Sequence, residues 1–194
     1  MGAMLPILRA AFVKKTGLEL GNAEAYLLAM LALENAHGKA IWNYNWGNVI
    51  RWNDDQDYFF IGQNPREFRS LASHEQGAEN FINTLFSSTN KRIVEAALDD
   101  DFEGFFEGIH TLHPETKKAY NYLTDFDILD SALAAYSKLV DKFKDSPLDE
   151  VLIGPPRAGT IKPTMRNNSS SSGVIILGVV SILFVGMVYL GKRK

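Results

Sequence analysis

Residues 22–38, NAEAYLLAMLALENAHG, decide the fold of this chain. Asn22 is suited to cap a helix, the residues that follow it are apolar on nearly every face, and Gly38 is suited to end the helix. A helix that is apolar on all sides has to be buried. The sequence therefore predicts a central helix around which the rest of a domain packs.

The pattern changes after this helix. Three short β-like segments, separated by turns rich in Asn, Asp, Gly and Pro, lie at 48–52, 58–61 and 66–71. Helical patterns then return at 73–86, 93–98, 102–109 and 125–143. Capping pairs precede the first and the last of these helices, at Ser73 with Gln76 and at Thr124 with Asp127. We expect an α+β domain that is mainly helical and carries a small antiparallel β lobe.

The C-terminal part of the chain differs from the rest in charge and hydropathy. Of 23 acidic and 20 basic side chains among 194 residues, residues 151–194 contain six of the bases and none of the acids. Residues 173–191 form an uncharged apolar run, about as long as a helix must be to cross a bilayer. We expect a transmembrane helix there, a Pro- and Ser-rich linker at 145–172 and a basic C-terminus at 192–194, with residues 1–144 as the folded domain.

Composition excludes several kinds of chemistry. The chain has no cysteine, which rules out disulfides, thiolate metal sites and cysteine nucleophiles. Its four histidines lack the spacing of metal ligands, so we expect no metal and no cofactor. A basic tail beside an apolar run favours membrane lipid over nucleic acid as a partner. The first 15 residues do not resemble a cleaved secretory signal, so the tail is the expected anchor, while its orientation and the oligomeric state stay open.

Glu34 is the most informative residue. It lies at the end of the predicted central helix, where apolar neighbours and the negative end of the helix dipole both disfavour an ionised carboxylate. We therefore expect the pKa of Glu34 to be raised. A carboxyl that keeps its proton near neutral pH can act as a general acid toward a glycosidic oxygen. The alternative for this residue is a last-turn side chain that points into water.

A segment rich in aromatic and amide side chains follows the central helix. Aromatic rings stack on the C–H faces of sugars, and asparagine can pair with hydroxyl and acetamido groups. The residues that we expect to bind a saccharide are Asn45, Trp46, Asn48 and Trp52. The alternative is a hydrophobic core, and we assign Phe59 and Trp42 to that core before Trp46.

A second carboxylate, acting as base or nucleophile, has four candidates in the β lobe: Asp54, Asp55, Asp57 and Glu67. The alternative for the aspartates is a solvated turn.

Four stretches, taken in order, resemble a known family. They are LENAHGK at 33–39 with NYNWGNV at 43–49, FRSLASHEQG at 68–77, and YLTD at 122–125. Together they resemble the glucosaminidase and flagellar-muramidase branch of the lysozyme-like superfamily. The resemblance implies a lysozyme-like fold with a cleft between an α lobe and a β lobe, and cleavage of β-1,4 bonds in the glycan strand of peptidoglycan. It also implies that Glu34 is the catalytic acid and that Tyr122 orients the sugar or stabilises positive charge at the anomeric carbon.

The chain departs from the family pattern at two positions. Ala40 stands where Ser is usual, and Leu123 stands where Ala is usual. Neither change removes a reacting group. Some members of the superfamily act with a single Glu, assisted by a hydroxyl or acetamido group of the substrate. N-acetylglucosaminidase, muramidase and lytic transglycosylase activity therefore all stay open.

The predicted anchor and this resemblance together imply a single-pass membrane protein whose catalytic domain cleaves peptidoglycan at the periplasmic wall. By analogy, a tail anchor, the lack of a leader-like segment and a compact muralytic domain lead us to expect a component of a membrane-containing phage virion that opens the wall locally during genome entry. One alternative is a bacterial envelope enzyme that clears wall for a flagellum or secretion apparatus. Another is a non-catalytic saccharide-binding or structural membrane protein that has kept the fold.

Overall fold

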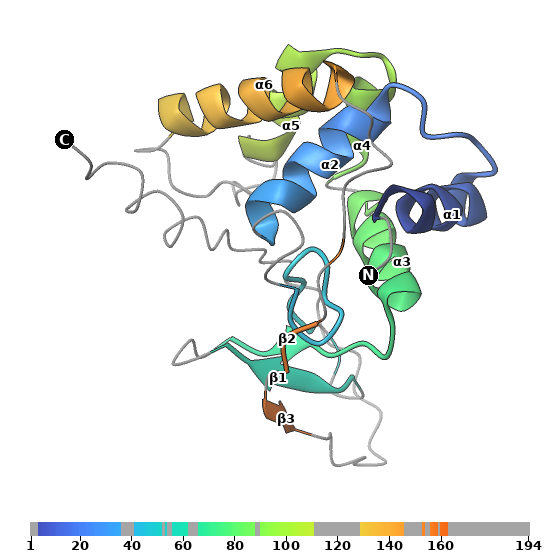
Figure 1. The fold of residues 1–194 in the computed structure, drawn as a ribbon, viewed down its shortest axis with the longest axis vertical. Coiled ribbons are helices and arrows are strands. Elements are labelled where there is room, and N and C mark those ends of the chain that lie inside the picture. The colour runs from blue at the N-terminus through green and yellow to red at the C-terminus, as the bar shows by residue number, and fades with distance from the viewer. Residues whose placement is uncertain are drawn as a thin grey trace.

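The protein is a mainly helical α+β domain with a small antiparallel sheet, as the sequence predicts (Figure 1). The computed structural model describes residues 4–35, 41–51, 53, 56–61, 66–87, 90–110, 129–145, 153, 156–158 and 160–162. The helices are α1 (Met4–Thr16), α2 (Ala23–Glu34), α3 (His74–Leu85), α4 (Lys91–Leu98), α5 (Phe102–His110) and α6 (Leu129–Asp145). In Figure 1 they fill the upper part of the view, and the strands lie below them.

The helix α2 is the centre of the helical part. All of its residues except Glu24 and Leu33 are buried, as expected for a helix that is apolar on every face. It packs against α6 and α4. Asn22 is the N-cap residue of α2, as predicted, but its side chain makes no capping hydrogen bond and instead donates to the backbone oxygen of Leu98, 3.3 Å away. This contact joins the start of α2 to the end of α4.

Of the two predicted capping pairs, Thr124 with Asp127 lies outside the described residues, and Ser73 with Gln76 lies at the start of α3. The Ser73 side chain accepts a hydrogen bond from the Gln76 backbone N–H at 3.3 Å, which confirms the cap of α3. The helix α1 is an addition to the predicted elements. Its buried residues, which repeat at helical spacing, are Met4, Leu5, Leu8, Ala11 and Phe12. The signal for α1 is therefore present in the sequence, and α1 lies beside α3.

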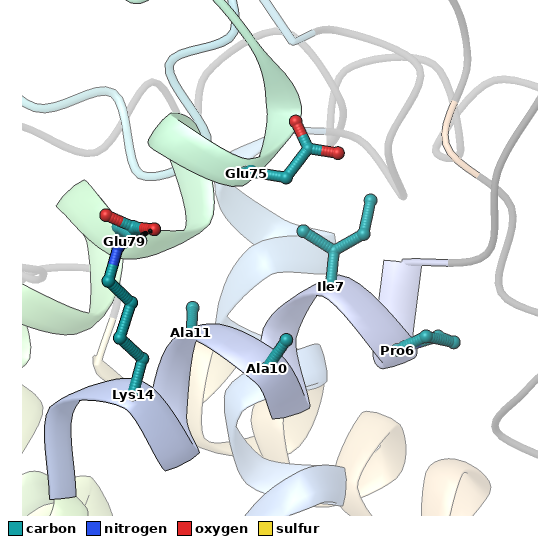
Figure 2. Close-up of a pocket in the computed structure, with 7 residues that line it drawn as sticks. All are labelled: Pro6, Ile7, Ala10, Ala11, Lys14, Glu75 and Glu79. Carbon is teal, nitrogen blue, oxygen red and sulfur yellow. Dashed lines mark hydrogen bonds and ion pairs between the residues drawn. The ribbon is translucent and has the colours of Figure 1, made fainter.

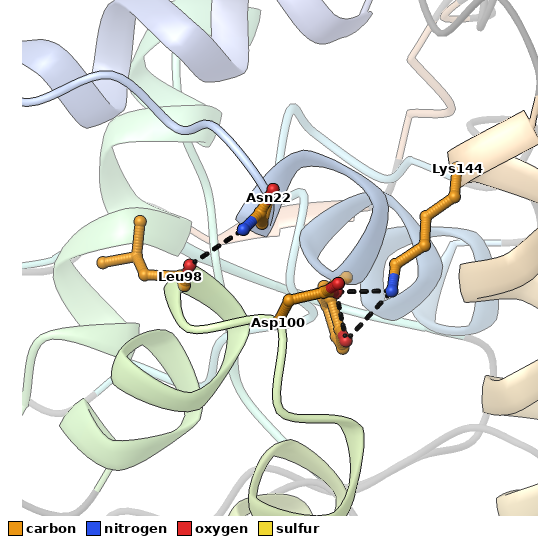
Figure 3. A network of polar contacts seen from close by, with 5 residues as sticks. Asn22, Leu98, Asp100 and Lys144 are labelled. Atoms are coloured by element: carbon orange, nitrogen blue, oxygen red, sulfur yellow. Dashed lines mark hydrogen bonds and ion pairs between the residues drawn. The ribbon is translucent and has the colours of Figure 1, made fainter.

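A polar cluster ties α2 to α6 and to the turn after α4 (Figure 3). Asp100 has a left-handed backbone (φ 57°), forms an ion pair with Lys144 and accepts a hydrogen bond from the Tyr26 hydroxyl at 2.8 Å. The ammonium group of Lys144 holds the pKa of Asp100 below its ordinary value, and burial raises the pKa of Tyr26. Because Asp100 and Lys144 are both substantially exposed, the ion pair itself contributes little to stability.

The sheet has the strand order β2-β1-β3, with both pairs antiparallel. The strands are β1 (Tyr58–Phe60), β2 (Phe68–Arg69) and β3 (Thr160–Lys162). Phe59 stands opposite Phe68 on one side and Ile161 on the other. The predicted segment 48–52 pairs with β2 only through an isolated bridge between Ile50 and Phe68.

The strand β3 corrects the predicted boundary of the domain at residue 144. Ile153 is buried in the core, and the backbone N–H of Arg157 donates to the oxygen of Ile41 at 2.7 Å. The oxygen of Arg157 in turn accepts from the N–H of Asn43 at 2.9 Å. Part of the predicted linker 145–172 therefore belongs to the domain, because its backbone supplies hydrogen bonds to β1 and to the turn after α2.

The predicted transmembrane helix at 173–191 lies outside the described residues. Among the helices that are described, none is long and apolar enough to cross a membrane. A depression of about 280 Å³ lies between α1 and α3, and Figure 2 shows the side chains that line it. Its lining residues are Pro6, Ile7, Ala10, Ala11, Lys14, Glu75 and Glu79. It contains none of the residues predicted to act on a saccharide.

The new boundary has a direct test. A chain that ends at residue 152 should be less stable than one that ends at residue 166, by about 2–4 kcal/mol, because it loses the buried Ile153 side chain and the β3 ladder. Urea unfolding of both chains measures the difference. Equal stability would show that residues 153–162 do not hold the sheet together and would restore the boundary at 144.

Candidate active site

The carboxyl group of Glu34 lies at the C-terminal end of α2 and is buried, with 8% of the residue exposed. Burial raises the pKa of Glu34 from its ordinary value of 4.5 to about 7, and a hydrogen bond from Asn48 partly opposes that rise. The sequence-based expectation of a raised pKa is met, and the alternative of a side chain pointing into water is wrong. A large fraction of the molecules therefore carries a neutral acid here at neutral pH.

Among the described residues, Asn48 donates a hydrogen bond to this carboxyl group. Its amide nitrogen lies 2.6 Å from the backbone oxygen of Glu34 and 3.3 Å from Oε2 of the same residue. Asn48 is 3% exposed, so these bonds are sheltered from water. The amide nitrogen of Asn48 is thus engaged by Glu34, and the predicted contact of Asn48 with a sugar stays a prediction.

The turn that carries Asn48 has an unusual backbone. Asn43, Tyr44 and Asn48 all have positive φ, at 43°, 60° and 49°. Asparagine tolerates this left-handed region better than most residues that are not glycine, whereas an aromatic residue there is uncommon. The Asn-rich sequence of this turn thus has a structural reason.

Asn45 holds the same turn together from inside. It is fully buried, and its amide nitrogen donates to the backbone oxygens of Val49 at 2.8 Å and Arg69 at 3.0 Å. Its side-chain oxygen accepts from the Val49 N–H at 2.8 Å. Because both amide protons are used within the protein, the prediction that Asn45 binds substrate is corrected to a structural role.

Trp46 belongs to the core as well. It has no exposed surface, and its indole N–H donates to Nδ1 of His74 at 3.1 Å. Burial lowers the pKa of His74, which agrees with a neutral ring whose Nδ1 accepts a hydrogen bond. The prediction that Trp46 stacks on a sugar is therefore wrong in this structure. Phe59 is fully buried, as expected, but Trp42 is only partly buried, so the expected order of the two tryptophans is reversed.

Two of the four candidates for a second carboxylate are described. Glu67 forms an ion pair with Arg51, whose guanidinium also lies 4.1 Å from the ring centre of Tyr58. Asp57 is exposed, and its backbone oxygen accepts from Ser70. Neither acid is among the causes of the raised pKa of Glu34, which are burial and Asn48. The predicted role of these two residues as a second carboxylate stays a prediction.

The remaining predicted site residues, Tyr122, Trp52, Asp54 and Asp55, lie outside the described residues. Among the side chains that are described, no cluster of His, Asp and Glu is arranged to hold a metal ion.

The structure adds one site residue that sequence reasoning did not place, Asn35. This residue is fully buried, and its amide nitrogen donates to the backbone oxygen of Trp46 at 3.2 Å, which ties the end of α2 to the turn.

Comparison with protein-family models, with curated proteins and with solved structures finds no match for this chain. The chemistry that this site can perform is therefore inferred from the positions of its own residues. One buried carboxyl group, held by one amide donor, sits where an apolar helix meets a tight turn. Such a group can deliver a proton at neutral pH and take one back after ionisation.

The tight contact between this turn and α3 can be tested at Gly77. A Cβ atom there would collide with the backbone oxygen of Tyr44 and would lie 2.7 Å from Cδ1 of Trp46. Gly77→Ala should lower the free energy of unfolding by about 1–3 kcal/mol, even though alanine favours a helix by about 1 kcal/mol over glycine. Thermal unfolding measures the change. A more stable variant would show that the turn can move away from α3.

The neutral state of Glu34 has a consequence for stability. Its folded pKa of about 7 lies above the ordinary value of 4.5, so the folded state binds the proton more tightly than the unfolded state. The protein should lose about 3 kcal/mol of stability as pH rises from about 4.5 through about 7, and Glu34→Gln should not show this loss.

Urea unfolding of the wild type and of Glu34→Gln at pH 4.5 and pH 8 measures this difference, and any effect that glutamine has at both pH values cancels. Glu19→Gln, which changes an exposed carboxyl group, is the matched control and should follow the wild type. A parallel pH dependence in wild type and Glu34→Gln would show that Glu34 is ionised throughout and would contradict its burial as a neutral acid.

Proposed function

We propose that this protein cleaves the β-1,4-linked glycan strand of peptidoglycan with Glu34 as its general acid. The observation that carries the proposal is the buried Glu34 carboxyl group, whose pKa of about 7 allows it to be protonated before the reaction and ionised after it. The proposal also draws on the family resemblance of residues 33–49, 68–77 and 122–125. It includes a lysozyme-like arrangement, in which the substrate lies between the helices and the small sheet.

The reaction uses one proton and one carboxyl group. The proton of Glu34 moves to the glycosidic oxygen, and the bond from that oxygen to C1 breaks with its electron pair going to the oxygen. Water, or the 6-hydroxyl group of the same sugar, then adds to C1 and gives its proton to the Glu34 carboxylate. The first route is hydrolysis and the second is transglycosylation, and both return Glu34 to its starting state.

The setting of this activity is part of the same proposal. Residues 173–191 would anchor the chain in a membrane, and Tyr122 would stabilise the positive charge that develops at C1. A membrane-containing phage particle that opens the wall at genome entry is the setting we favour. The predicted combination of a tail anchor with a compact wall-cleaving domain supports it. A bacterial envelope enzyme differs from it in setting and not in chemistry.

The activity itself is tested with purified full-length protein in detergent and a suspension of peptidoglycan. The rate of clearing should fall as pH rises through about 7, because the ionised Glu34 cannot donate a proton. Glu34→Gln should lower the rate by about 10²- to 10⁴-fold, whereas Glu19→Gln should clear the suspension at the wild-type rate.

The products decide the reaction type. Mass spectrometry should find new reducing ends of N-acetylglucosamine or N-acetylmuramic acid after hydrolysis, or 1,6-anhydro-N-acetylmuramic acid after transglycosylation. Clearing by Glu34→Gln at the wild-type rate would remove Glu34 from the mechanism. Peptidoglycan bound but not cleaved by the folded wild type would favour the non-catalytic saccharide-binding protein.

A further inference from the structure

The orientation of the Glu34 carboxyl group is fixed by a residue that the proposed mechanism does not use as a reacting group. The amide nitrogen of Asn48 lies 2.6 Å from the backbone oxygen of Glu34. A backbone carbonyl can only accept a hydrogen bond, so the nitrogen of this amide, and not its oxygen, must face Glu34. The same nitrogen lies 3.3 Å from Oε2, and therefore Oε2 also receives an N–H donor.

This donor distinguishes the two oxygens of the carboxyl group. A protonated carboxyl has one oxygen that accepts hydrogen bonds well and one hydroxyl oxygen that donates its own proton. An N–H group next to Oε2 favours the state in which Oε2 is the accepting oxygen. The proton is then carried by Oε1.

We propose that Asn48 is a positioning residue, whose amide holds Oε2 of Glu34 as the accepting oxygen and thereby directs the transferable proton to Oε1. This inference rests on the proposed function for its role in catalysis, but the contact itself can be tested without a substrate. After proton transfer the same N–H group faces a carboxylate, and a hydrogen bond to a charged oxygen is stronger than one to a neutral oxygen. Asn48 therefore also favours the ionised form that must exist between the two proton transfers.

The backbone of the turn explains how Asn48 reaches Glu34. Its φ of 49° is in the left-handed region, which asparagine and glycine adopt more readily than other residues. Asn48→Gly thus removes the amide and keeps the backbone conformation accessible. Asn43 is a matched position in the same turn, with φ of 43°, and the causes that set the pKa of Glu34 are burial and Asn48 rather than Asn43. Asn43→Gly keeps both backbone bonds of that residue, to Arg157 and Leu71.

The contact is tested on full-length protein in detergent, labelled with ¹³C at the glutamate carboxyl carbon. The NMR signal of Glu34 is assigned by its loss in Glu34→Gln and is followed as pH changes. Because the Asn48 hydrogen bond lowers the pKa of Glu34, Asn48→Gly should move the titration midpoint to higher pH, and Asn43→Gly should leave it unchanged. The same midpoint in wild type and in Asn48→Gly would overturn the inference.

A second measurement covers the case in which Asn48→Gly does not fold. In the wild type, the ¹⁵N and ¹H shifts of the Asn48 side-chain amide should change with the same midpoint as the Glu34 carboxyl signal. In Glu34→Gln these shifts should not titrate in that range. Amide shifts that stay constant through the Glu34 titration in the wild type would also overturn the inference.

The catalytic part of the inference is read from kinetics on peptidoglycan. Asn48→Gly should lower kcat by about 10- to 100-fold, as expected for the loss of a hydrogen bond to a charged group, with KM within about twofold of the wild type. The alkaline limb of its pH profile should move to higher pH, which a general loss of structure would not cause. An unchanged kcat would overturn the positioning role. A wild type that does not cleave peptidoglycan would overturn the proposed function, while the NMR titration would still decide the contact between Asn48 and Glu34.

Discussion

The burial of α2 is the constraint on which the rest of the structure depends. Because this helix is apolar on nearly every face, other elements must cover it, and α4 and α6 lie against it. The burial of α2 extends to its last turn. The ionisable side chain of Glu34 is therefore buried together with the apolar residues of that turn. Among the described residues, this burial is the cause that raises the pKa of Glu34.

The end of a buried helix leaves backbone oxygens that need donors. Here the amide of Asn48 donates to the backbone oxygen of Glu34, and the amide of Asn35 reaches from the end of the helix to the backbone of Trp46. Asn45 closes the same turn on itself and on Arg69. The amide side chains near Glu34 therefore first satisfy the backbone, and one of them also touches the carboxyl group.

The sequence predicted those parts of the fold that are determined locally. The buried character of α2, the cap at Ser73 and the raised pKa of Glu34 each depend on a few neighbouring residues. The errors concern contacts between distant residues. The strand β3 pairs with β1, which lies about 100 positions earlier in the sequence. Trp46 is buried because its indole donates to His74 and packs against Gly77 on α3. Composition alone could not separate a tryptophan that binds a sugar from one that packs on a helix.

Fold stability and proton transfer place opposite requirements on the residue at position 34. A neutral carboxyl in the core makes the folded state less stable as pH rises above 4.5, so stability alone would favour glutamine or an apolar residue at this helix end. The hydrogen bond from Asn48 reduces this cost, because it stabilises the ionised form. It does so only in part, which leaves the pKa of Glu34 near 7 and keeps both protonation states accessible at neutral pH. A purely structural acid would gain from a stronger donor or a cation, whereas an acid that has to release and recover a proton is best served by this intermediate value.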